Sequence, residues 1–562
     1  MYVLGFNSTH DASAALVRSG EVRQAVEEER LSRVRHHFGF PERAIRRVLE
    51  SEGIGPRDVA HVAFYWNPYE GLFRFGAHFL RNLPRSLTYL GRQPSLWTSF
   101  LRLPRRLRAM GFRARFHFVS HHTAHAASAF YPSPFPRAAI LSVDGTGEWT
   151  TTLLARGDGR DVRSVRTISY PHSLGKVYEA ATQYLGFEPN SGEGKVMGLA
   201  AYGRPRYADE FERIVPLNGH GEFRLDTRFF RFQFGESRKW SDDFARLLGP
   251  PRAPGSPIEA RHEDVARALQ DRLEEAALHL AAELHGVTGE TDLCLAGGVA
   301  LNSVMNGRLL REGPFRGIFV QPAAHDAGAA LGAALVVSRR KDPAFERREM
   351  TSAALGTAFD SSRCERALAG AGVLFRRPAG LADEAARLLA EGRVVAWFEG
   401  RSEYGPRALG SRSLLADPRD PGMRDRLNVR VKGRETFRPF APAVPLEAAA
   451  RFFDGATDSP FMLMTFPVRE EVRRAIPAVT HVDGTARVQT VRREIQPRFH
   501  ALLEAFGRLT GVPVLLNTSL NRRGEPIVDS PEEAVALYLA SEIDALVLED
   551  LLAVKGNGGG AR

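Results

Sequence analysis

The sequence predicts an α/β protein made of two parts, and three patterns support this fold class. Residues 3–20 and 140–157 each run through a strand, a polar turn and a second strand, so a repeated hairpin is expected. Helical and strand patterns then alternate along the chain. The pattern thins near residue 340 and begins afresh near residue 373, which gives expected domains of 1–350 and 351–562.

Later elements follow from local signals. One apolar face predicts a helix from Glu259 to His285, ended by Gly286. The strand that follows, at 293–295, runs directly into a glycine-rich turn, where either a ligand or a simple tight turn is expected. Near the end of the chain, Ser530 begins a capping box that predicts a final helix.

Composition excludes several protein classes. The 562 residues suffice for three to four domain-sized units, and 43% hydrophobic with 25% charged residues is typical of a globular enzyme. The only two cysteines, Cys294 and Cys364, exclude a disulfide framework and a four-cysteine zinc site. No signal peptide or apolar run of membrane-spanning length is visible, so a cytoplasmic protein without stable membrane insertion is expected.

The net charge of +10 is concentrated in one segment. Between Gly71 and Phe116 the chain has ten arginines and no Asp, Glu or Lys, and the remainder is electroneutral. Prolines and aromatic residues at nearly helical intervals predict short amphipathic helices here. A solvated cap, a lid or acceptor platform, and contact with an anionic acceptor or a membrane surface remain open alternatives. The prolines and aromatics are Pro84, Pro94, Pro104, Phe73, Phe75, Phe79, Tyr89, Trp97 and Phe100.

A metal site is indicated by two histidines and two carboxylates. His121 and His125 have the i, i+4 spacing that lets two imidazoles on one helix face bind one metal ion, whereas His122 points elsewhere. Asp144 opens a glycine-rich turn after a strand, and Asp326 precedes another helix. This donor set suits Fe(II), Zn or Mn. The alternative is a set of structural histidines in the core.

The second part carries an anion-binding signature. Arg407 lies in a loop shaped by glycine and proline, and Lys432 and Arg438 lie in a second such loop. Arginine offers bidentate donors and lysine a mobile point charge, which suits a phosphate or carbamate-like anion. A solvated basic surface is the alternative. The blocks 481–487 and 516–526 add Arg487 and a run of small hydrogen-bonding side chains.

Together these motifs resemble the carbamoyltransferase family that includes the nodulation-factor, cephamycin and tobramycin carbamoyltransferases, over nearly the whole chain. The motifs are His10–Leu16 (HDASAAL), Glu27–Arg33 (EEERLSR), the His121/His125 pair, Gly192–Ala200 (GEGKVMGLA), Gly297–Asn302 (GGVALN), Tyr404–Ser413 (YGPRALGSRS) and Lys432–Phe440 (KGRETFRPF).

The resemblance implies an N-terminal Kae1/TsaD-like domain with the duplicated actin/Hsp70-type nucleotide-binding fold, and a C-terminal α+β YrdC-like domain. It also implies two steps, in which carbamoyl phosphate and ATP, with Mg(II), give carbamoyl adenylate before the carbamoyl group passes to an acceptor hydroxyl. Among first-row metals, Fe(II) is favoured. The acceptor is a small molecule, such as a sugar or an antibiotic core. No nucleic-acid partner is expected, and a homodimer is left open.

The resemblance also assigns roles to individual residues. It gives catalysis to His10, Lys432 and Arg438, with His10 at the transfer site as a general base. Carbamoyl phosphate and the adenylate are assigned to Arg407, Lys432, Arg438, Arg487 and Ser519. The nucleotide is assigned to Gly145, Gly297, Gly298 and Asn302, and the metal to His121, His125, Asp144 and Asp326.

Three other functions compete with this interpretation. A threonylcarbamoyl-type tRNA-modifying enzyme shares both domain types but would need a large basic face, and the chain outside residues 71–116 is neutral. A hydrogenase-maturation carbamoyltransferase needs cysteine-pair zinc modules, which two cysteines cannot build. An actin-like ATP-binding scaffold would leave the Lys432–Phe440 block unexplained.

Overall fold

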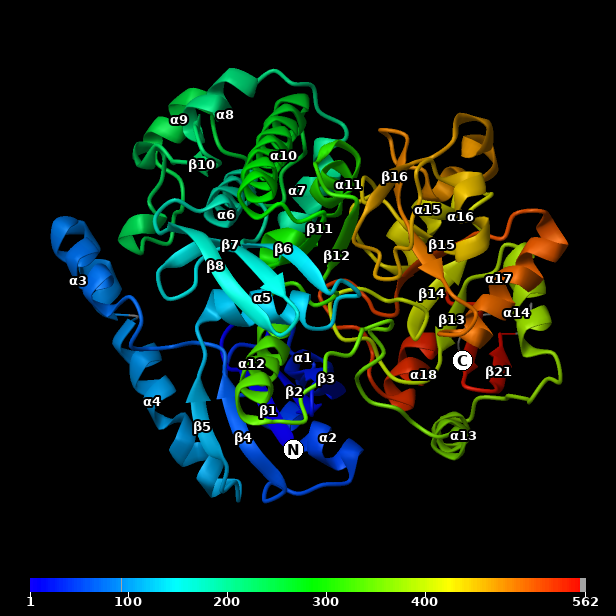
Figure 1. Ribbon diagram of the computed structural model, residues 1–562. Helices are drawn as coiled ribbons and strands as arrows, with labels where there is room; N and C mark the ends of the chain where they lie inside the picture. The colour runs from blue at the N-terminus through cyan, green and yellow to red at the C-terminus, as the bar shows by residue number, and fades with distance from the viewer. Residues whose placement is uncertain (92, 556–562) are drawn as a thin grey trace. The chain divides into compact units, whose positions relative to one another are not determined.

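The computed structural model describes residues 1–91 and 93–555, with the side chains of residues 89–98 left out. The chain divides into two compact units (Figure 1). The first contains Met1–Ala25 and Phe38–Met350, and the second contains Val26–His37 and the chain from Thr351 onward. The linear pattern did not suggest that a short segment near residue 30 belongs with the second unit.

Two five-stranded sheets of the same design form the first unit. In one, β1 pairs antiparallel with β2 and parallel with β4, and β4 pairs parallel with β5. In the other, β6 pairs antiparallel with β7 and parallel with β11, and β11 pairs parallel with β12. Their strand orders, β3-β2-β1-β4-β5 and β8-β7-β6-β11-β12, correspond position by position. The expected repeated hairpin is confirmed. The strands are β1 (Tyr2–Asn7), β2 (Ser13–Arg18), β3 (Glu21–Glu27), β4 (Val59–Phe64), β5 (Arg115–Phe118), β6 (Arg137–Val143), β7 (Thr150–Asp158), β8 (Asp161–Ser169), β11 (Asp292–Ala296) and β12 (Gly317–Val320).

Two helices of small residues pack between these sheets. Helix α12 (Asp326–Lys341) covers β1, β2 and β4, while α5 (His121–Phe130) covers β6 and β11 and packs against α12 (Figure 1). Glycine permits the close approach, because a Cβ at Gly5 would lie 2.0 Å from the Ala330 carbonyl oxygen and one at Gly332 would lie 1.8 Å from that of Ala124. The first residues of both helices consequently meet between the sheets.

The remaining helices of the first unit surround the second sheet, apart from α2 and those of the arginine-rich segment. Helix α10 passes through Gly286 and ends at Thr288, with Gly289 as its left-handed cap at φ 66°, so the expected stop at Gly286 was wrong. The elements are α2 (Glu42–Glu52), α6 (Leu174–Tyr184), α7 (Glu193–Ala200), α8 (Ala208–Ile214), β9 (Leu217–Asn218), β10 (Glu222–Phe223), η2 (Thr227–Phe229), η3 (Phe232–Phe234), α9 (Asp242–Leu248), α10 (Ala260–Thr288), η4 (Gly298–Leu301) and α11 (Ser303–Glu312).

The arginine-rich segment forms the expected short helices. They are α3 (Leu72–Arg81), η1 (Arg85–Gly91) and α4 (Gln93–Ala109). Arg92 and the side chains of Tyr89, Pro94 and Trp97, which entered that expectation, lie outside the described residues. Within the described chain, no helix combines the length and the apolar character needed to cross a membrane.

A seven-stranded sheet forms the centre of the second unit, in the order β18-β15-β19-β14-β13-β20-β21. Trp397, Phe499 and Phe506 belong to the buried core in which α14 and α17 pack on this sheet. Ser530 accepts a hydrogen bond from the Glu533 N–H and begins α18, as expected. The strands are β13 (Val395–Phe398), β14 (Arg412–Ala416), β15 (Ala441–Pro445), β16 (Thr465–Pro467), β17 (Thr485–Arg487), β18 (Gln489–Val491), β19 (Leu515–Ser519), β20 (Ala545–Leu548) and β21 (Leu551–Val554). The helices are α1 (Glu28–Ser32), α13 (Ser361–Gly370), α14 (Leu381–Ala390), α15 (Met423–Arg426), the π-turn η5 (Leu427–Val431), α16 (Leu446–Phe452), η6 (Glu470–Ala475), η7 (Pro477–Val479), α17 (Pro497–Thr510) and α18 (Pro531–Leu539).

Contacts of two arginines, of which Arg30 is buried, tie α1 to the second unit. Arg30 donates a 2.6 Å hydrogen bond to the Gly405 carbonyl, and Arg33 donates one of 2.7 Å to the Ile527 carbonyl. Both units mix helices with sheets, so the predicted α/β class is confirmed.

Candidate functional site

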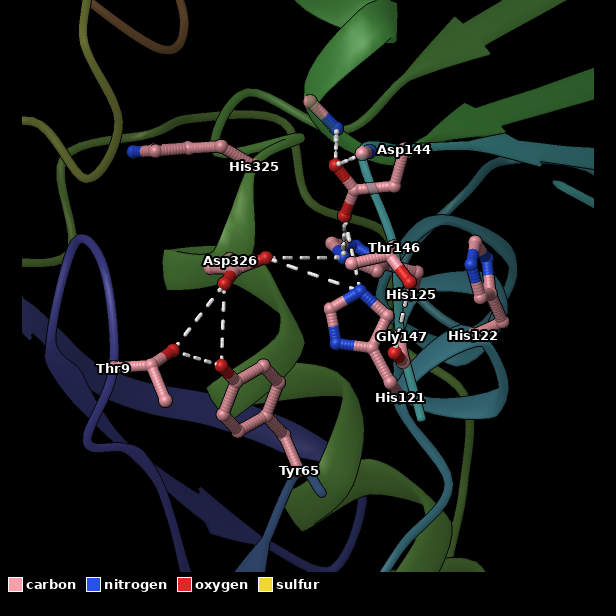
Figure 2. A network of polar contacts seen from close by, with 12 residues as sticks. Thr9, Tyr65, His121, His122, His125, Asp144, Thr146, Gly147, His325 and Asp326 are labelled. Carbon is pink, nitrogen blue, oxygen red and sulfur yellow. Dashed lines mark hydrogen bonds and ion pairs between the residues drawn. The ribbon is translucent and has the colours of Figure 1, made fainter. Parts of the chain in front are cut away.

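The first unit brings four predicted metal ligands together (Figure 2). His121 and His125 lie one turn apart on α5, Asp144 directly follows β6, and Asp326 is the first residue of α12. One donor atom from each lies within 4.8 Å of the other three. Asp144 Oδ2 is 3.0 Å from His121 Nε2 and 3.1 Å from His125 Nε2, and Asp326 Oδ1 lies 3.9 and 3.6 Å from the same two atoms.

The chemistry of this cluster fits a divalent cation. His121 and His125 are at most 1% exposed. Within the described chain, neither ring nitrogen of His125 makes a hydrogen bond of ordinary geometry, although Nε2 has its ion-pair contacts with the aspartates. Burial lowers the pKa of His125, but its contacts with the two carboxylates outweigh this and raise the pKa to about 9. Two imidazole nitrogens facing two carboxylate oxygens form the borderline donor set that first-row metals prefer.

In each carboxylate, one oxygen faces the two histidines and the other accepts hydrogen bonds from the surrounding chain. While Asp144 Oδ2 faces the histidines, Oδ1 accepts hydrogen bonds from the backbone N–H groups of Gly145 at 2.7 Å and Gly298 at 3.3 Å. Burial raises the pKa of Asp144, yet its contacts with His121 and His125 hold the pKa well below the usual value. Two of the glycines predicted for the nucleotide therefore position a predicted metal ligand.

Asp326 is held in the same way by side chains that sequence reasoning missed. Its Oδ2 accepts hydrogen bonds from the Tyr65 hydroxyl at 3.1 Å and the Thr9 hydroxyl at 3.4 Å, and these two hydroxyls contact each other (Figure 2). Burial, reinforced by the Asp326 charge, raises the pKa of Tyr65 well above its usual value, so the phenol stays protonated and donates. Such outer contacts orient ligands and tune a metal site.

Two nearby histidines face away from this cluster. His122 contacts the Ser142 hydroxyl and the Thr150 carbonyl at 2.9 Å each, which confirms that it points elsewhere. Burial and the neighbouring histidines hold the pKa of His122 well below its usual value, so its ring is neutral. The ring of His325 is also directed away from the four ligands in Figure 2.

Other predicted residues of the first unit have distinct surroundings. His10 is only partly buried, and its Nδ1 lies 3.0 Å from Asp11 Oδ2. Burial lowers the pKa of His10, but the contact with Asp11 outweighs it and the pKa is raised. Asn302 caps α11 by accepting from the Met305 N–H, and its amide pairs with that of Gln270. A nucleotide contact of Asn302 stays a prediction.

Five cations converge in the second unit. Arg407, Lys432, Arg438 and Arg487 were predicted, and Arg434 joins them. Within the described residues, Lys432, Arg434, Arg438 and Arg487 form no ion pair with a carboxylate, and the Arg487 Nε has no hydrogen-bond partner. Lys432 Nζ contacts the Ser519 carbonyl and hydroxyl and lies 2.8 Å from Asn521 Oδ1, so Ser519 lies at the same cluster.

The loops that carry these cations are shaped by two buried polar side chains. Glu403 Oε1 accepts backbone hydrogen bonds from Leu409 at 2.7 Å and Ser411 at 2.8 Å, which closes the loop around Arg407. Asn428, in the π-turn η5, donates to the Arg438 carbonyl at 3.1 Å and accepts from Arg434 Nε at 2.7 Å. Neither Glu403 nor Asn428 was singled out from the sequence.

Burial and mutual repulsion make these groups unusually weak bases. Burial, followed by the charge of Arg438, lowers the pKa of Arg407 to about 10 and that of Arg434 to about 9. Burial, Arg434 and Arg438 hold the pKa of Lys432 well below its ordinary value, and burial with the charges of Arg407, Arg434 and Arg438 holds the pKa of Arg487 well below its own. An anion bound among them would relieve both effects.

Comparison with known proteins agrees with these observations. The family model described as the carbamoyltransferase N-terminus matches residues 2–335, and that described as the carbamoyltransferase C-terminus matches residues 386–555. An uncharacterized protein of Synechocystis is 41% identical, over 99% of this chain and 97% of that protein. Nodulation protein NolNO of Sinorhizobium fredii is 41% identical, over 97% of this chain and 79% of its own.

A relative with a stated activity is more distant. The 3'-hydroxymethylcephem-O-carbamoyltransferase of Streptomyces clavuligerus is 29% identical, over 98% of both chains. Among solved structures, component A of the (R)-2-hydroxyglutaryl-CoA dehydratase of Acidaminococcus fermentans covers 60% of this chain and 98% of its own, at 16% identity and a TM-score of 0.33, too low to assign a fold. The two family models together span most of the sequence, and the chain therefore belongs to the carbamoyltransferase family of carbamoyl-transferring enzymes.

Proposed function

We propose that this enzyme transfers a carbamoyl group to a small-molecule hydroxyl in two steps, of which the first consumes ATP. In the first, carbamoyl phosphate loses its phosphate to water, and an oxygen of the resulting carbamate attacks the α-phosphate of ATP and displaces pyrophosphate. In the second, the acceptor oxygen attacks the carbamoyl carbon of the adenylate, and AMP leaves. Because carbamate is a poor electrophile, joining it to AMP supplies the leaving group that the transfer needs.

The observation that carries the proposal is the cationic cluster of the second unit. Carbamoyl phosphate, ATP and pyrophosphate are all multiply charged anions, and of the five basic side chains that converge here four form no ion pair with a carboxylate of the described residues. Arg407 and Arg438 offer planar bidentate donors, whereas Lys432 offers a point charge held by Ser519 and Asn521. We assign adenylate formation to this unit, with a YrdC-like fold and Mg(II) carried by the ATP.

The first unit is assigned the transfer step. Its two sheets of matching strand order support an actin-type, Kae1-like nucleotide fold, with Gly145, Gly297 and Gly298 near the phosphates. His121, His125, Asp144 and Asp326 would hold the metal, with Fe(II) favoured. Such an ion supplies a Lewis acid that polarises a carbamoyl oxygen.

His10 is the residue of the first unit that we assign to proton transfer. Asp11 orients its ring through Nδ1, and Nε2 is the atom assigned to the proton of the acceptor hydroxyl. The acceptor is placed in the class of small hydroxylated compounds because the named relative acts on a hydroxymethyl group of a cephem.

Isotope exchange tests the first step without knowledge of the acceptor. With carbamoyl phosphate and ATP present, labelled pyrophosphate is expected to enter ATP, and Lys432→Ala should lower the exchange rate at least about a hundredfold. The matched control is Arg523→Ala, which removes a positive charge beside the cluster from a side chain that is 64% exposed. Absence of exchange in the wild-type protein, or equal loss in both variants, would refute the proposal.

A further inference from the structure

The arginine-rich segment, residues 71–116, has no part in either proposed step. All nine of its described arginines are exposed, and Arg106 alone of the nine forms an ion pair there, with Glu42. The segment contributes no acidic side chain of its own. A concentration of unpaired positive charge at a surface attracts an extended anionic partner.

Exposed apolar side chains lie beside these charges on α3. No residue of α3 is fully buried, and Phe73 and Leu80 are 94% and 66% exposed. Positions seven apart share a helix face, so Phe73 and Leu80 form one row, and Arg74 and Arg81 form a parallel row next to it. Leu83 and Leu87, which follow α3, are about half exposed.

The opposite side of the segment is anchored to the first unit. His78 contacts the Gln233 carbonyl at 2.9 Å and packs against the rings of Trp149 and Tyr170, while Arg85 lies over the ring of Phe234. The outward side of α3 is therefore held in one orientation and is not free to fold back and bury its apolar row.

Helix α4 continues the basic surface. Phe100, Leu103 and Leu107 point into the first unit and are at most 5% exposed. Arg102, Arg105 and Arg108 are exposed, as is Leu101. Figure 1 shows α3 and α4 following each other along one margin of the first unit.

We propose that this surface, formed by the outward side chains of α3 and of the described parts of η1 and α4, docks on an anionic lipid bilayer. The exposed arginines favour a negatively charged partner. The exposed Phe73/Leu80 row favours a partner that has an apolar layer beneath its charges, and a bilayer has such a layer whereas a polynucleotide does not. With 10 residues α3 is far too short to span a bilayer, so it lies in the interface. The protein binds to the membrane surface reversibly and does not insert across it.

Co-sedimentation of the full chain with vesicles tests this docking. Vesicles containing phosphatidylglycerol should bind the protein, vesicles of phosphatidylcholine alone should not, and raising the salt from about 0.1 to about 1 M should release most of it. The triple variant R102Q/R105Q/R108Q should bind roughly a hundredfold more weakly, at about fivefold for each arginine. F73S/L80S should bind about tenfold more weakly, because it removes apolar area from the bilayer boundary.

A charge-matched variant controls for net charge. R163Q/R366Q/R474Q removes three exposed arginines outside the segment and should bind vesicles like the wild type. Thermal unfolding of every variant checks the fold, and pyrophosphate exchange, which measures the proposed function, should be unaffected by all of them. Equal binding to neutral and anionic vesicles, equal loss in the two arginine triples, or tighter binding to a single-stranded RNA that is insensitive to F73S/L80S would overturn the proposal.

Discussion

The metal set of the first unit, meaning the four predicted ligands, and the five-cation cluster of the second are both partly buried concentrations of charge, but their charges are balanced differently. In the metal set, two carboxylates face two imidazoles, and the raised pKa of His125 allows a proton to balance a negative charge when no cation is bound. In the cation cluster, positive groups outnumber the one nearby carboxylate, Glu435, and burial with mutual repulsion lowers the pKa values of the group.

This difference separates a site that is stable by itself from one that is stabilised by its ligand. Opposite charges at about 3 Å stabilise each other without a bound cation, so the four predicted ligands are already close together. Buried like charges destabilise the fold until an anion compensates them. Metal removal and anion removal should therefore have different consequences for activity and for stability.

The largest expected effect is the loss of bound metal from the first unit while the second unit keeps its activity. Asp144→Asn removes the carboxylate that contacts both histidines, so bound metal should fall from about one ion per chain to less than about a tenth of that. Pyrophosphate exchange, assigned to the second unit, should remain, whereas carbamoyl transfer to an acceptor should be lost. Elemental analysis and the exchange assay measure these two outcomes on the same preparation.

Glu148→Gln provides a matched control for this substitution. Glu148 is a half-buried carboxylate that accepts hydrogen bonds from the backbone N–H groups of His121 and Asn67, but it is not one of the four predicted ligands. Its variant should keep the metal. Loss of exchange in Asp144→Asn would show that the two sites are not independent in this way.

A smaller effect concerns pH and the cation cluster. In the free protein the pKa of Lys432 is held well below 10.5 by burial, by Arg434 and by Arg438. A bound anion favours the protonated amine, so at pH values between the lowered pKa and 10.5 binding takes up a proton and affinity falls as the pH rises. Calorimetry of pyrophosphate binding in two buffers of different ionisation enthalpy should report uptake of up to about one proton. Lys432→Met should abolish that uptake, and proton release on binding would contradict the assignment.

The site residues that could be predicted from the sequence are those set by helical spacing or by a position at the end of a strand or the start of a helix. His121 and His125 are fixed by helical spacing, and Asp144 and Asp326 by their places at a strand end and a helix start. Tyr65 and Thr9 could not be found in this way, because the first sheet and α12 bring them to Asp326 across more than 250 residues of chain. Only tertiary structure makes that contact.

Other misses have different causes. Arg434 lies within the Lys432–Phe440 motif, but a position two residues after Lys432 does not indicate that both side chains reach one cluster. The hydrogen bond from Arg434 to Asn428 holds the Arg434 side chain there. Gly286 looked like a helix stop, yet a glycine in a long helix costs only about 1 kcal/mol, and packing of α10 outweighs this. The placement of Val26–His37 depends on Arg30 and Arg33 contacts that no linear pattern encodes.

The smallest expected effect tests the cost of uncompensated charge directly. Arg487 is half-buried, its buried Nε has no hydrogen-bond partner in the described chain, and burial together with three neighbouring arginines lowers its pKa. Replacing it with methionine keeps much of the side-chain volume and removes one of the repelling charges. The free energy of unfolding without anions should therefore rise by about 1 kcal/mol, while the stabilisation by added pyrophosphate should shrink. Chemical denaturation with and without pyrophosphate measures both quantities.

Arg498→Met, at an exposed arginine paired with Glu549, is the control and should change neither quantity by more than about 0.5 kcal/mol. A fall in stability for Arg487→Met would mean that its contacts in the free protein outweigh the repulsion, and the contrast between a balanced and an unbalanced site would have to be abandoned.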